Sequence, residues 1–405
     1  MIIRKYKMDK TLKINKTNLG LFFLLFPYFN PIGLKYIPAL VSVYDAIQLW
    51  KLCACLYIWF LYFRKNRLSK FFIWVFSFQG LMIATTLLNH AYDSKVITNM
   101  LIATSLVMIT ELCVRTCFDK YLNQLWKISA LFVCINFILT IIFPKGMTFA
   151  TLYKSTLNPL YFLGIDNALA EQLIPFVFLA TLRKVLKATG NNLKDNLELI
   201  VSYAIALITI AIVDSATGLF SILVFVILSV YYSFAIKRRV PYKLISIIYG
   251  LFFIVIIIMQ SNNLVVEFVS NLLGRSTTFT GRNILWEMAL SKILERPILG
   301  YGYTAGNIEV WGGMFSSHNI FLEIALQGGI FSLLLFIIIT WLGIRKNAKK
   351  SVQVSNTIVL AIFGVLLKGL MEVNIPFFYY IMLALAYCTI PTFNGDSNNE
   401  EMKLD

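Results

Sequence analysis

Residues 280–319 contain the side chains whose types and spacing are best suited to chemistry, in a chain that is otherwise largely apolar. Arg282 could bind a phosphate group, because a guanidinium forks onto phosphate oxygens and a helix N-terminus adds positive potential. His318 could take or hold a proton near neutral pH. The plainer interpretations are an arginine that snorkels to the headgroup level and a histidine on a polar surface. We treat the other histidine, His90, as a surface residue.

A polar stripe follows the histidine along the expected helix 318–343. Asn319, Glu323 and Gln327 recur at every fourth residue and therefore share one face. Polar side chains in lipid cost free energy unless they face a cavity or another helix. We therefore expect a hydrophilic pocket that opens outward, with His318 at its rim. One of the two serines that precede the histidine is expected to be the N-cap of the helix.

Two further cations could join Arg282 in binding a pyrophosphate. Arg275 lies seven residues before it, on a side of the membrane where charges are sparse. Lys368, like Lys51, falls inside an apolar span, where an unpaired charge is expensive. Glu372 lies four residues after Lys368, so the two could instead form a structural ion pair along one helix. The sequence supports both interpretations of Lys368.

A helix inside the expected outer loop, 261–317, should carry Arg282. Its apolar residues recur at helical spacing and are Trp286, Ala289, Leu290, Ile293 and Leu294. Thr280 fits the N-cap, and Pro297 stands where the helix should stop. Arg282 lies one turn before Trp286 on this stripe, so both should face the protein or the membrane. Trp286 therefore joins the candidate substrate-binding residues.

The composition indicates an integral membrane protein. Of 405 residues, 59% are hydrophobic and 14% are charged, whereas a soluble chain of this length rarely exceeds half apolar residues. The net charge of +16 would suit nucleic acid, but the basic residues fall in short loops on alternate sides of the apolar runs. No basic face with interleaved aromatics occurs, so we expect no nucleic-acid partner. The six cysteines lie in or beside apolar runs without metal-ligand spacing, and we expect no metal site.

The apolar runs predict an all-α polytopic protein of about 12 transmembrane helices in one membrane domain, 1–405. The expected spans are roughly 18–43, 46–63, 70–89, 96–114, 124–143, 167–183, 197–213, 218–236, 243–260, 318–343, 354–372 and 376–391. The basic loops put both termini in the cytoplasm and the large loop 261–317, between the ninth and tenth spans, outside. A loop of that length usually carries function. We expect no cleaved signal peptide, because the first apolar run lacks a small-residue cleavage site.

Two segments resemble the signature region of the O-antigen ligase/polymerase family, which includes Wzy-type polysaccharide polymerases and lipid A–core ligases. The first is ERPILGYGYTAGN…SSHNIFLEIALQGGIFSLLL, preceded by TGRNILWEMAL. The second is GIDNALAE, which contains Asn167 and is similar to the entry to a central span in that family. The resemblance covers roughly residues 160–340, and the N-terminal third is similar in topology alone.

This resemblance implies a GT-C-like helical bundle and an inverting, metal-independent glycosyl transfer without a cofactor. The donor would be a glycan on undecaprenyl pyrophosphate. Arg282 would bind the pyrophosphate, and His318 would assist the attack of the acceptor hydroxyl as general base or orienting group. The candidate residues for binding pyrophosphate or sugar are Arg275, Lys368, Asn319, Glu323, Asn167 and Trp286.

One departure from the family pattern concerns the turn before the eighth span. Many members carry a basic residue there, in Ser-Arg-Gly or a similar sequence. This chain has Ala216-Thr217-Gly218, with Asp214 nearby. The second cation must therefore come from elsewhere, and Arg275 or Lys368 is expected to supply it.

The favoured function is a polymerase of O-antigen, capsule or exopolysaccharide, which adds glycan to the non-reducing end of another lipid-linked repeat unit. A ligase of the same family is one alternative. A transporter or flippase for lipid-linked oligosaccharide is another, although no internal repeat of the transporter kind is visible. The expected location is the plasma (inner) membrane of a bacterium, with the active site outside the cytoplasm. Expected partners are the undecaprenyl-pyrophosphate-linked oligosaccharide, the bilayer, a chain-length regulator and a flippase.

Overall fold

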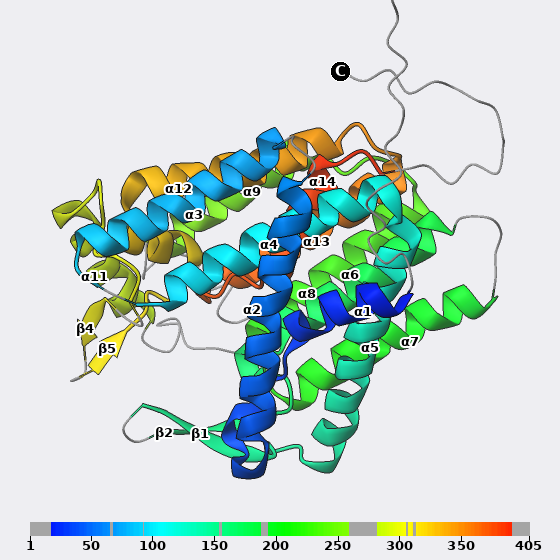
Figure 1. The fold of residues 1–405 in the computed structure, drawn as a ribbon, viewed down its shortest axis with the longest axis horizontal. Helices are drawn as coiled ribbons and strands as arrows, with labels where there is room; N and C mark the ends of the chain where they lie inside the picture. The colour runs from blue at the N-terminus through cyan, green and yellow to red at the C-terminus, as the bar shows by residue number, and fades with distance from the viewer. Residues whose placement is uncertain are drawn as a thin grey trace, which may run out of the picture.

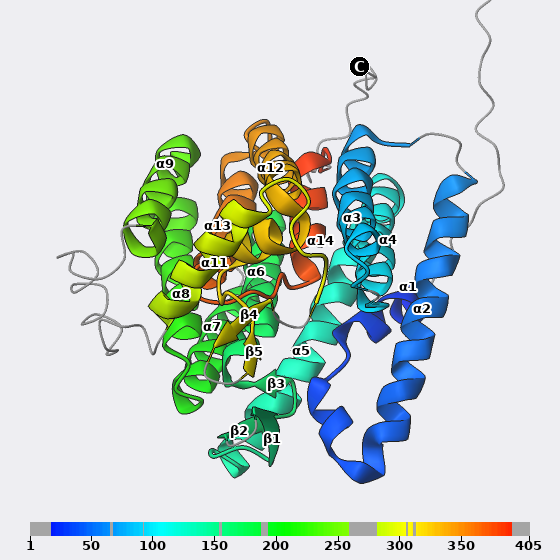
Figure 2. The ribbon, with the colours of Figure 1, turned by 90° about the vertical axis from the view of Figure 1, so that its left-hand side faces the viewer.

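The apolar runs of the sequence form helices, whose backbone polar groups bond within each helix as a lipid environment requires. The computed structural model describes residues 18–64, 68–91, 93–153, 156–187, 193–258, 282–304, 307–310 and 313–390. Within these ranges the chain is a helical bundle with two small antiparallel sheets (Figures 1 and 2). The predicted all-α polytopic class is confirmed.

The first half of the bundle begins with a broken span. Its helices are α1 (Asn18–Leu25), α2 (Val41–Phe63), α3 (Lys70–Leu88), α4 (Lys95–Thr116) and α5 (Phe118–Ile142). Three short 3-10 helices join α1 to α2: η1 (Phe26–Phe29), η2 (Ile32–Tyr36) and η3 (Pro38–Leu40). Pro27, Pro31 and Pro38 lie in this connection, and proline lacks the N–H that an α-helix interior needs. The prolines therefore explain why the first span is irregular.

The second half contains the helices that carry the candidate site. They are α6 (Ala170–Leu186), α7 (Leu193–Ile212), α8 (Ala216–Ser229), α9 (Tyr242–Phe253), α11 (Arg282–Glu295), α12 (Ile320–Asn347), α13 (Val352–Gly369) and α14 (Phe378–Tyr387). Short π-helical segments, η5 (Val230–Ala235) and η6 (Ile254–Ile258), extend α8 and α9. A 3-10 turn, η4 (Asp166–Ala168), precedes α6. An irregular segment separates α11 from α12.

Eight helices among the described residues are long and apolar enough to cross a membrane. They coincide with the second to fifth, seventh, eighth, tenth and eleventh expected spans. The remaining four expected spans fall on shorter helices, namely α1 with η1, α6, α9 and α14. Helix α6 contains Pro175 and has charged residues at both ends, so it is not apolar along its whole length. By length and composition, fewer of the described helices qualify as membrane spans than the apolar runs predict.

The centre of the bundle is formed by α4, α6, α12, α13 and α14, whose residues are largely buried. Helices α2 and α9 lie at opposite sides of the bundle (Figure 2). Helix α9 exposes Leu244, Ile247 and Leu251, as expected for a helix that faces lipid. The polar side chains of the candidate site lie on the central helices and on the segments that connect them.

Two small sheets lie at the same end of the bundle (Figure 2). The first pairs β1 (Thr148–Tyr153), β2 (Thr156–Tyr161) and β3 (Gly164–Ile165), and the second pairs β4 (Ile308–Val310) and β5 (Gly313–Phe315). Both are antiparallel, with Thr148 opposite Leu160 and Ile308 opposite Phe315. Strands this short give no clear alternation in the sequence, and the pattern does not predict them. We call this end of the bundle the strand end.

Helix α11 is the helix expected in the loop 261–317, and it ends two residues before Pro297. Its buried face is formed by Leu285, Trp286 and Ala289, which pack on α12 and on the segment after α13. Leu294 is exposed, so its place on the predicted apolar stripe was wrong. The buried face turns toward Leu285 because neighbouring helices decide which part of a broad stripe is covered. The expected N-cap, Thr280, lies outside the described residues.

A break in α12 fixes the segment after α11. Gly329 interrupts the helix with φ of 70°, and a side chain there would overlap the carbonyl oxygen of Ile298. The carbonyl of Leu326, freed by the break, accepts a hydrogen bond from the N–H of Tyr301 at 2.7 Å. The glycine pair of the quoted motif therefore lets the loop join α12 through its backbone.

Candidate functional site

The start of α12 determines where His318 lies. Asn319 is the N-cap, because its side chain accepts hydrogen bonds from the N–H groups of Phe321 and Leu322, both at 3.0 Å. Its Nδ2 donates to the carbonyl of Leu370 at 3.0 Å, which ties this cap to the end of α13. The expected serine cap was therefore wrong. Serine and asparagine cap helices about equally well, so local sequence does not choose between them.

His318 precedes the helix in a left-handed conformation, with φ of 49°. Its side chain is 26% exposed, and Nδ1 lies 3.8 Å from Oε2 of Glu372. The other carboxylate oxygen, Oε1, accepts a hydrogen bond from Nη2 of Arg282 at 2.9 Å. Three separate parts of the chain therefore meet at one carboxylate: the first residue of α11, the residue before the α12 cap and the connection after α13. We call these residues the Arg–Glu–His cluster (Arg282, Glu372, His318).

The electrostatics of this cluster keep Glu372 ionised. Burial acts to raise the pKa of Glu372, but His318, Arg282 and Lys368 together hold that pKa below its usual value of 4.5. An ionised carboxylate can hold the Nδ1–H of a neutral imidazole, which leaves Nε2 free to accept a proton. The arrangement is therefore suited to general-base chemistry next to a cation.

Lys368 has a different partner from the one that its spacing suggests. Its Nζ forms an ion pair with Oε1 of Glu171, on α6, at 2.6 Å, and the lysine is almost completely buried. The expected pairing of Lys368 with Glu372 was therefore wrong. Helix α13 ends at Gly369, so Glu372 lies beyond the helix and the i, i+4 relation is lost. Glu171 is a residue that spacing could not connect to Lys368.

Glu323 and Gln327 face a polar cavity of about 420 Å³. Glu323 is held by three donors: the N–H and Oγ of Ser317, both at 2.8 Å, and Nε2 of Gln327 at 2.8 Å. Two of the three residues in the predicted stripe therefore line a pocket. The third, Asn319, is used as the helix cap and is fully buried.

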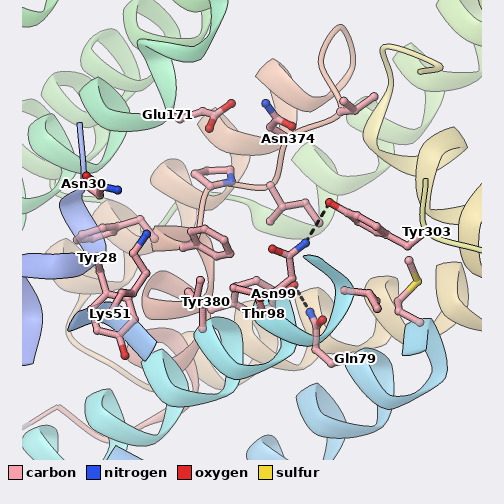
Figure 3. Close-up of a pocket in the computed structure, with 18 of the residues that line it drawn as sticks. Tyr28, Asn30, Lys51, Gln79, Thr98, Asn99, Glu171, Tyr303, Asn374 and Tyr380 are labelled. Atoms are coloured by element: carbon pink, nitrogen blue, oxygen red, sulfur yellow. Dashed lines mark hydrogen bonds between the residues drawn. The ribbon is translucent and has the colours of Figure 1, made fainter. Parts of the chain in front are cut away.

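The cavity lies between α2, α3, α4, α6, α12 and the segment that leads into α14 (Figure 3). Glu171 lines it, so the Lys368–Glu171 ion pair forms part of its wall. Neither Arg282 nor His318 is among the described residues that line this cavity, and the expected histidine rim was wrong. The left-handed backbone at His318 directs its side chain to Glu372 instead of along the stripe.

The other predicted site residues have structural contacts. Oδ1 of Asn167 accepts a hydrogen bond from Oγ of Ser215 at 2.9 Å, which joins the entry of α6 to the turn before α8. Trp286 is completely buried between α11 and α12, so its ring packs in the core there. Arg275 lies outside the described residues. Sequence reasoning therefore missed the site role of Glu372 and Glu171, although a carboxylate inside or beside an apolar span is itself a signal.

The fold and the site together define a polytopic helical membrane protein with a charged cluster and a polar cavity in its interior. Within the described ranges, no three His, Cys, Asp or Glu side chains are grouped as the ligands of a metal would be. Residues 201–337 match the family model described as O-antigen ligase. This match supports the predicted resemblance to the O-antigen ligase/polymerase family over that part of the chain, and it includes Arg282 and His318. No curated protein matches the sequence.

Proposed function

We propose that this protein is a glycosyltransferase that polymerises polysaccharide repeat units. It would transfer glycan from undecaprenyl pyrophosphate to the non-reducing end of another lipid-linked repeat unit. The observation that supports this best is the Arg–Glu–His cluster, which joins a cation, an ionised carboxylate and a histidine. Arg282 and His318 lie inside the matched family region, 201–337, and Glu372 lies beyond it. The match of residues 201–337 to the O-antigen ligase family model supports a lipid-linked glycan as the substrate class.

Arg282 is the residue we assign to the pyrophosphate. Its guanidinium has five donors, so it can retain Glu372 while it turns other N–H groups toward phosphate oxygens. Negative charge develops on the pyrophosphate as the bond to the sugar breaks, and a fixed cation stabilises that charge. A lipid pyrophosphate is already an activated leaving group, so the reaction requires no nucleotide.

His318 is the residue we assign to the acceptor. The carboxylate of Glu372 would hold Nδ1–H, and Nε2 would take the proton of the acceptor hydroxyl. As that oxygen bonds to the anomeric carbon, the bond from this carbon to the pyrophosphate oxygen breaks on the opposite face, which gives inversion. The distance of 3.8 Å between Nδ1 and the carboxylate is longer than a hydrogen bond. We expect it to shorten when substrates are bound, as apo sites often do.

The proposed location is the plasma membrane of a bacterium, with the strand end outside. Basic residues are concentrated in 64–70, 183–187, 237–243 and 345–350, at the ends of α2, α6 and α12 and at the start of α9 or in the chain next to them. Positive loops remain in the cytoplasm, so the cluster would meet a lipid-linked glycan after its transfer across the membrane. A flippase and a chain-length regulator are the partner proteins that we propose for it.

A ligase is the second candidate, because the matching family model is described as O-antigen ligase. A ligase would use the same donor and the same cluster but a different acceptor. The product separates the two: a polymerase yields lipid-linked chains of increasing length, whereas a ligase moves finished glycan from the lipid carrier to another acceptor.

The test substitutes the two residues and follows chain length. We expect Arg282→Ala and His318→Asn to reduce elongation by about 10²-fold or more while lipid-linked single repeats accumulate. Asparagine is chosen because it tolerates the left-handed backbone at position 318. His90→Asn is the matched control, because His90 has φ of 54°. Arg296→Ala, on an exposed arginine beside Tyr301, is the second control.

The amount of each variant in the membrane is measured by immunoblot. Normal elongation in both Arg282→Ala and His318→Asn, at normal protein levels, would show that the cluster is not catalytic. Loss of elongation in the His90→Asn control would show that the assay reports folding instead of chemistry.

A further inference from the structure

Lys51 is a buried cation that faces the polar cavity from the middle of α2. It is 7% exposed, and its Nζ donates to Oε1 of Gln48 on the same helix at 3.1 Å. In the part of the chain that the structure describes, no carboxylate forms an ion pair with it. A buried charge without a counter-ion is costly. Lys51 thus differs from Lys368, which has Glu171.

Asn30 lines the same cavity and is also unsatisfied. It lies between η1 and η2 and is 8% exposed, and neither Oδ1 nor Nδ2 has a hydrogen-bond partner among the described residues. Two other amides of the cavity are engaged: Gln79 donates to the hydroxyl of Tyr380 at 2.8 Å, and Asn99 donates to that of Tyr303 at 3.1 Å (Figure 3). Buried polar groups without partners are rare in native structures. Asn30 therefore indicates a ligand in the cavity.

Figure 3 shows Lys51, Asn30 and Tyr28 on one side of the cavity, with Tyr303 and Gln79 on the other. A cation and a free carboxamide on one wall fit a ligand that carries both a negative charge and hydroxyl groups. Such a ligand would give each of the two groups the partner that the protein does not supply.

The carboxylates of the cavity limit the charge of that ligand. Glu171 is paired with Lys368, and Glu323 accepts hydrogen bonds from Ser317 and Gln327, so both are committed to the protein. A second negative charge on the ligand would find no further Lys or Arg among the described residues that line the cavity. One unpaired cation, Lys51, is suited to one negative charge.

We infer that the cavity is a subsite for an acidic sugar, in which Lys51 pairs with the carboxylate of a uronic acid and Asn30 binds adjacent hydroxyls. The inference rests on the proposed function, in which the acceptor glycan must approach the Arg–Glu–His cluster. It adds the chemical class of one sugar in the repeat unit. Lys51 is then a specificity-determining residue that takes no part in the transfer itself.

The test measures binding, which is independent of glycosyl transfer. The full chain in lipid nanodiscs is titrated with a disaccharide of glucuronate and N-acetylglucosamine and with its carboxyl-reduced form. We expect the wild type to bind the carboxylate form more tightly by about ten-fold or more. Lys51→Met should abolish this preference, and Lys51→Arg should retain it. Lys35→Met, on an exposed lysine outside the cavity, is the matched control.

Asn30→Ala provides a second measurement, because it should weaken the binding of both disaccharides without changing the preference between them. The inference is overturned if the wild type binds the two forms equally, if neither form binds, or if Lys51→Met keeps the preference. These outcomes leave the proposed function untouched, since that function depends on chain elongation in the Arg282 and His318 variants. Conversely, if the Arg282 and His318 variants elongate normally and the proposed function is wrong, a measured preference for the carboxylate form would still stand.

Discussion

Arg282 and Lys368 are both paired with a glutamate, but the two ion pairs lie in different surroundings. Arg282 is 19% exposed, and its partner Glu372 lies in a connection between two helices and also contacts His318. Lys368 is nearly inaccessible, and its partner Glu171 lies on the facing helix α6. The first pair joins segments at the ends of elements, whereas the second joins two central helices.

This difference distinguishes a pair that can exchange its partner from one that cannot. A partly exposed guanidinium can turn to a phosphate without leaving its carboxylate bare, because water and His318 remain nearby. If a fully buried ammonium moves away from its carboxylate, two charges are left without partners in a medium of low dielectric constant. We therefore propose binding chemistry for the first pair and helix assembly for the second. That Lys368 supplies a second cation for the pyrophosphate stays a prediction, and its ion pair with Glu171 disfavours it.

The largest expected effect is on stability, from Lys368→Met. This substitution leaves the carboxylate of Glu171, which is only 14% exposed, without its cation, and we expect a loss of about 3–5 kcal/mol in the free energy of unfolding. Arg282→Met should cost considerably less, because Arg282 is 19% exposed against 2% for Lys368, and His318 remains beside Glu372. Thermal unfolding in detergent measures both. The double variant Lys368→Met/Glu171→Met should recover much of the loss, and equal destabilisation by the two single variants would remove the distinction between the pairs.

A smaller effect is expected from Glu372→Gln, about 1–3 kcal/mol near neutral pH. The native pKa of Glu372 lies below its usual value of 4.5, so its ionised form stabilises the fold. That contribution is fully present above pH 4.5, and it is lost as the pH falls from there through the native pKa. The wild type should therefore lose thermal stability more steeply than Glu372→Gln on acidification from about pH 5 to pH 3.

The control for this comparison is Glu287→Gln, on the exposed face of α11. Its pH profile should parallel that of the wild type. A Glu372→Gln profile that also parallels the wild type would mean that Glu372 gains nothing from Arg282 and His318. In that case the cluster would be a surface contact, and the contrast with Lys368 would have no functional meaning.

The smallest effect is expected from Asn319→Ala, about 1 kcal/mol for the loss of a helix cap. Ser69→Ala, which removes the cap of α3 and a hydrogen bond to the carboxylate of Glu111, should cost at least as much. The two should differ in chain elongation, because Asn319 also bonds to Leu370 and thereby holds the His318 segment against the segment of Glu372. Equal elongation by the two variants would show that this link does not position the cluster.

The N-cap of α12 illustrates how far local sequence determines the site. The motif around His318 predicts a helix start, and the structure has one within two residues. Several residues in this motif can cap a helix, however. In the structure the cap is Asn319, whose side-chain amide also donates to the carbonyl of Leu370. That contact depends on the end of α13, which lies about 50 residues away in the chain.

The sequence alone determined the class of the protein, because long apolar runs must form helices wherever backbone groups cannot bond to water. It also determined which segment carries Arg282, because that helix has its own period and its own breaker, Pro297, and it placed His318 at the start of the next apolar run. The tertiary structure decided the partners. Glu372 meets Arg282 and His318, and Lys368 meets Glu171, since α13 ends at Gly369 and α6 packs against it. Ion pairing depends on distances of a few ångströms between elements, and no periodicity within one element contains that information.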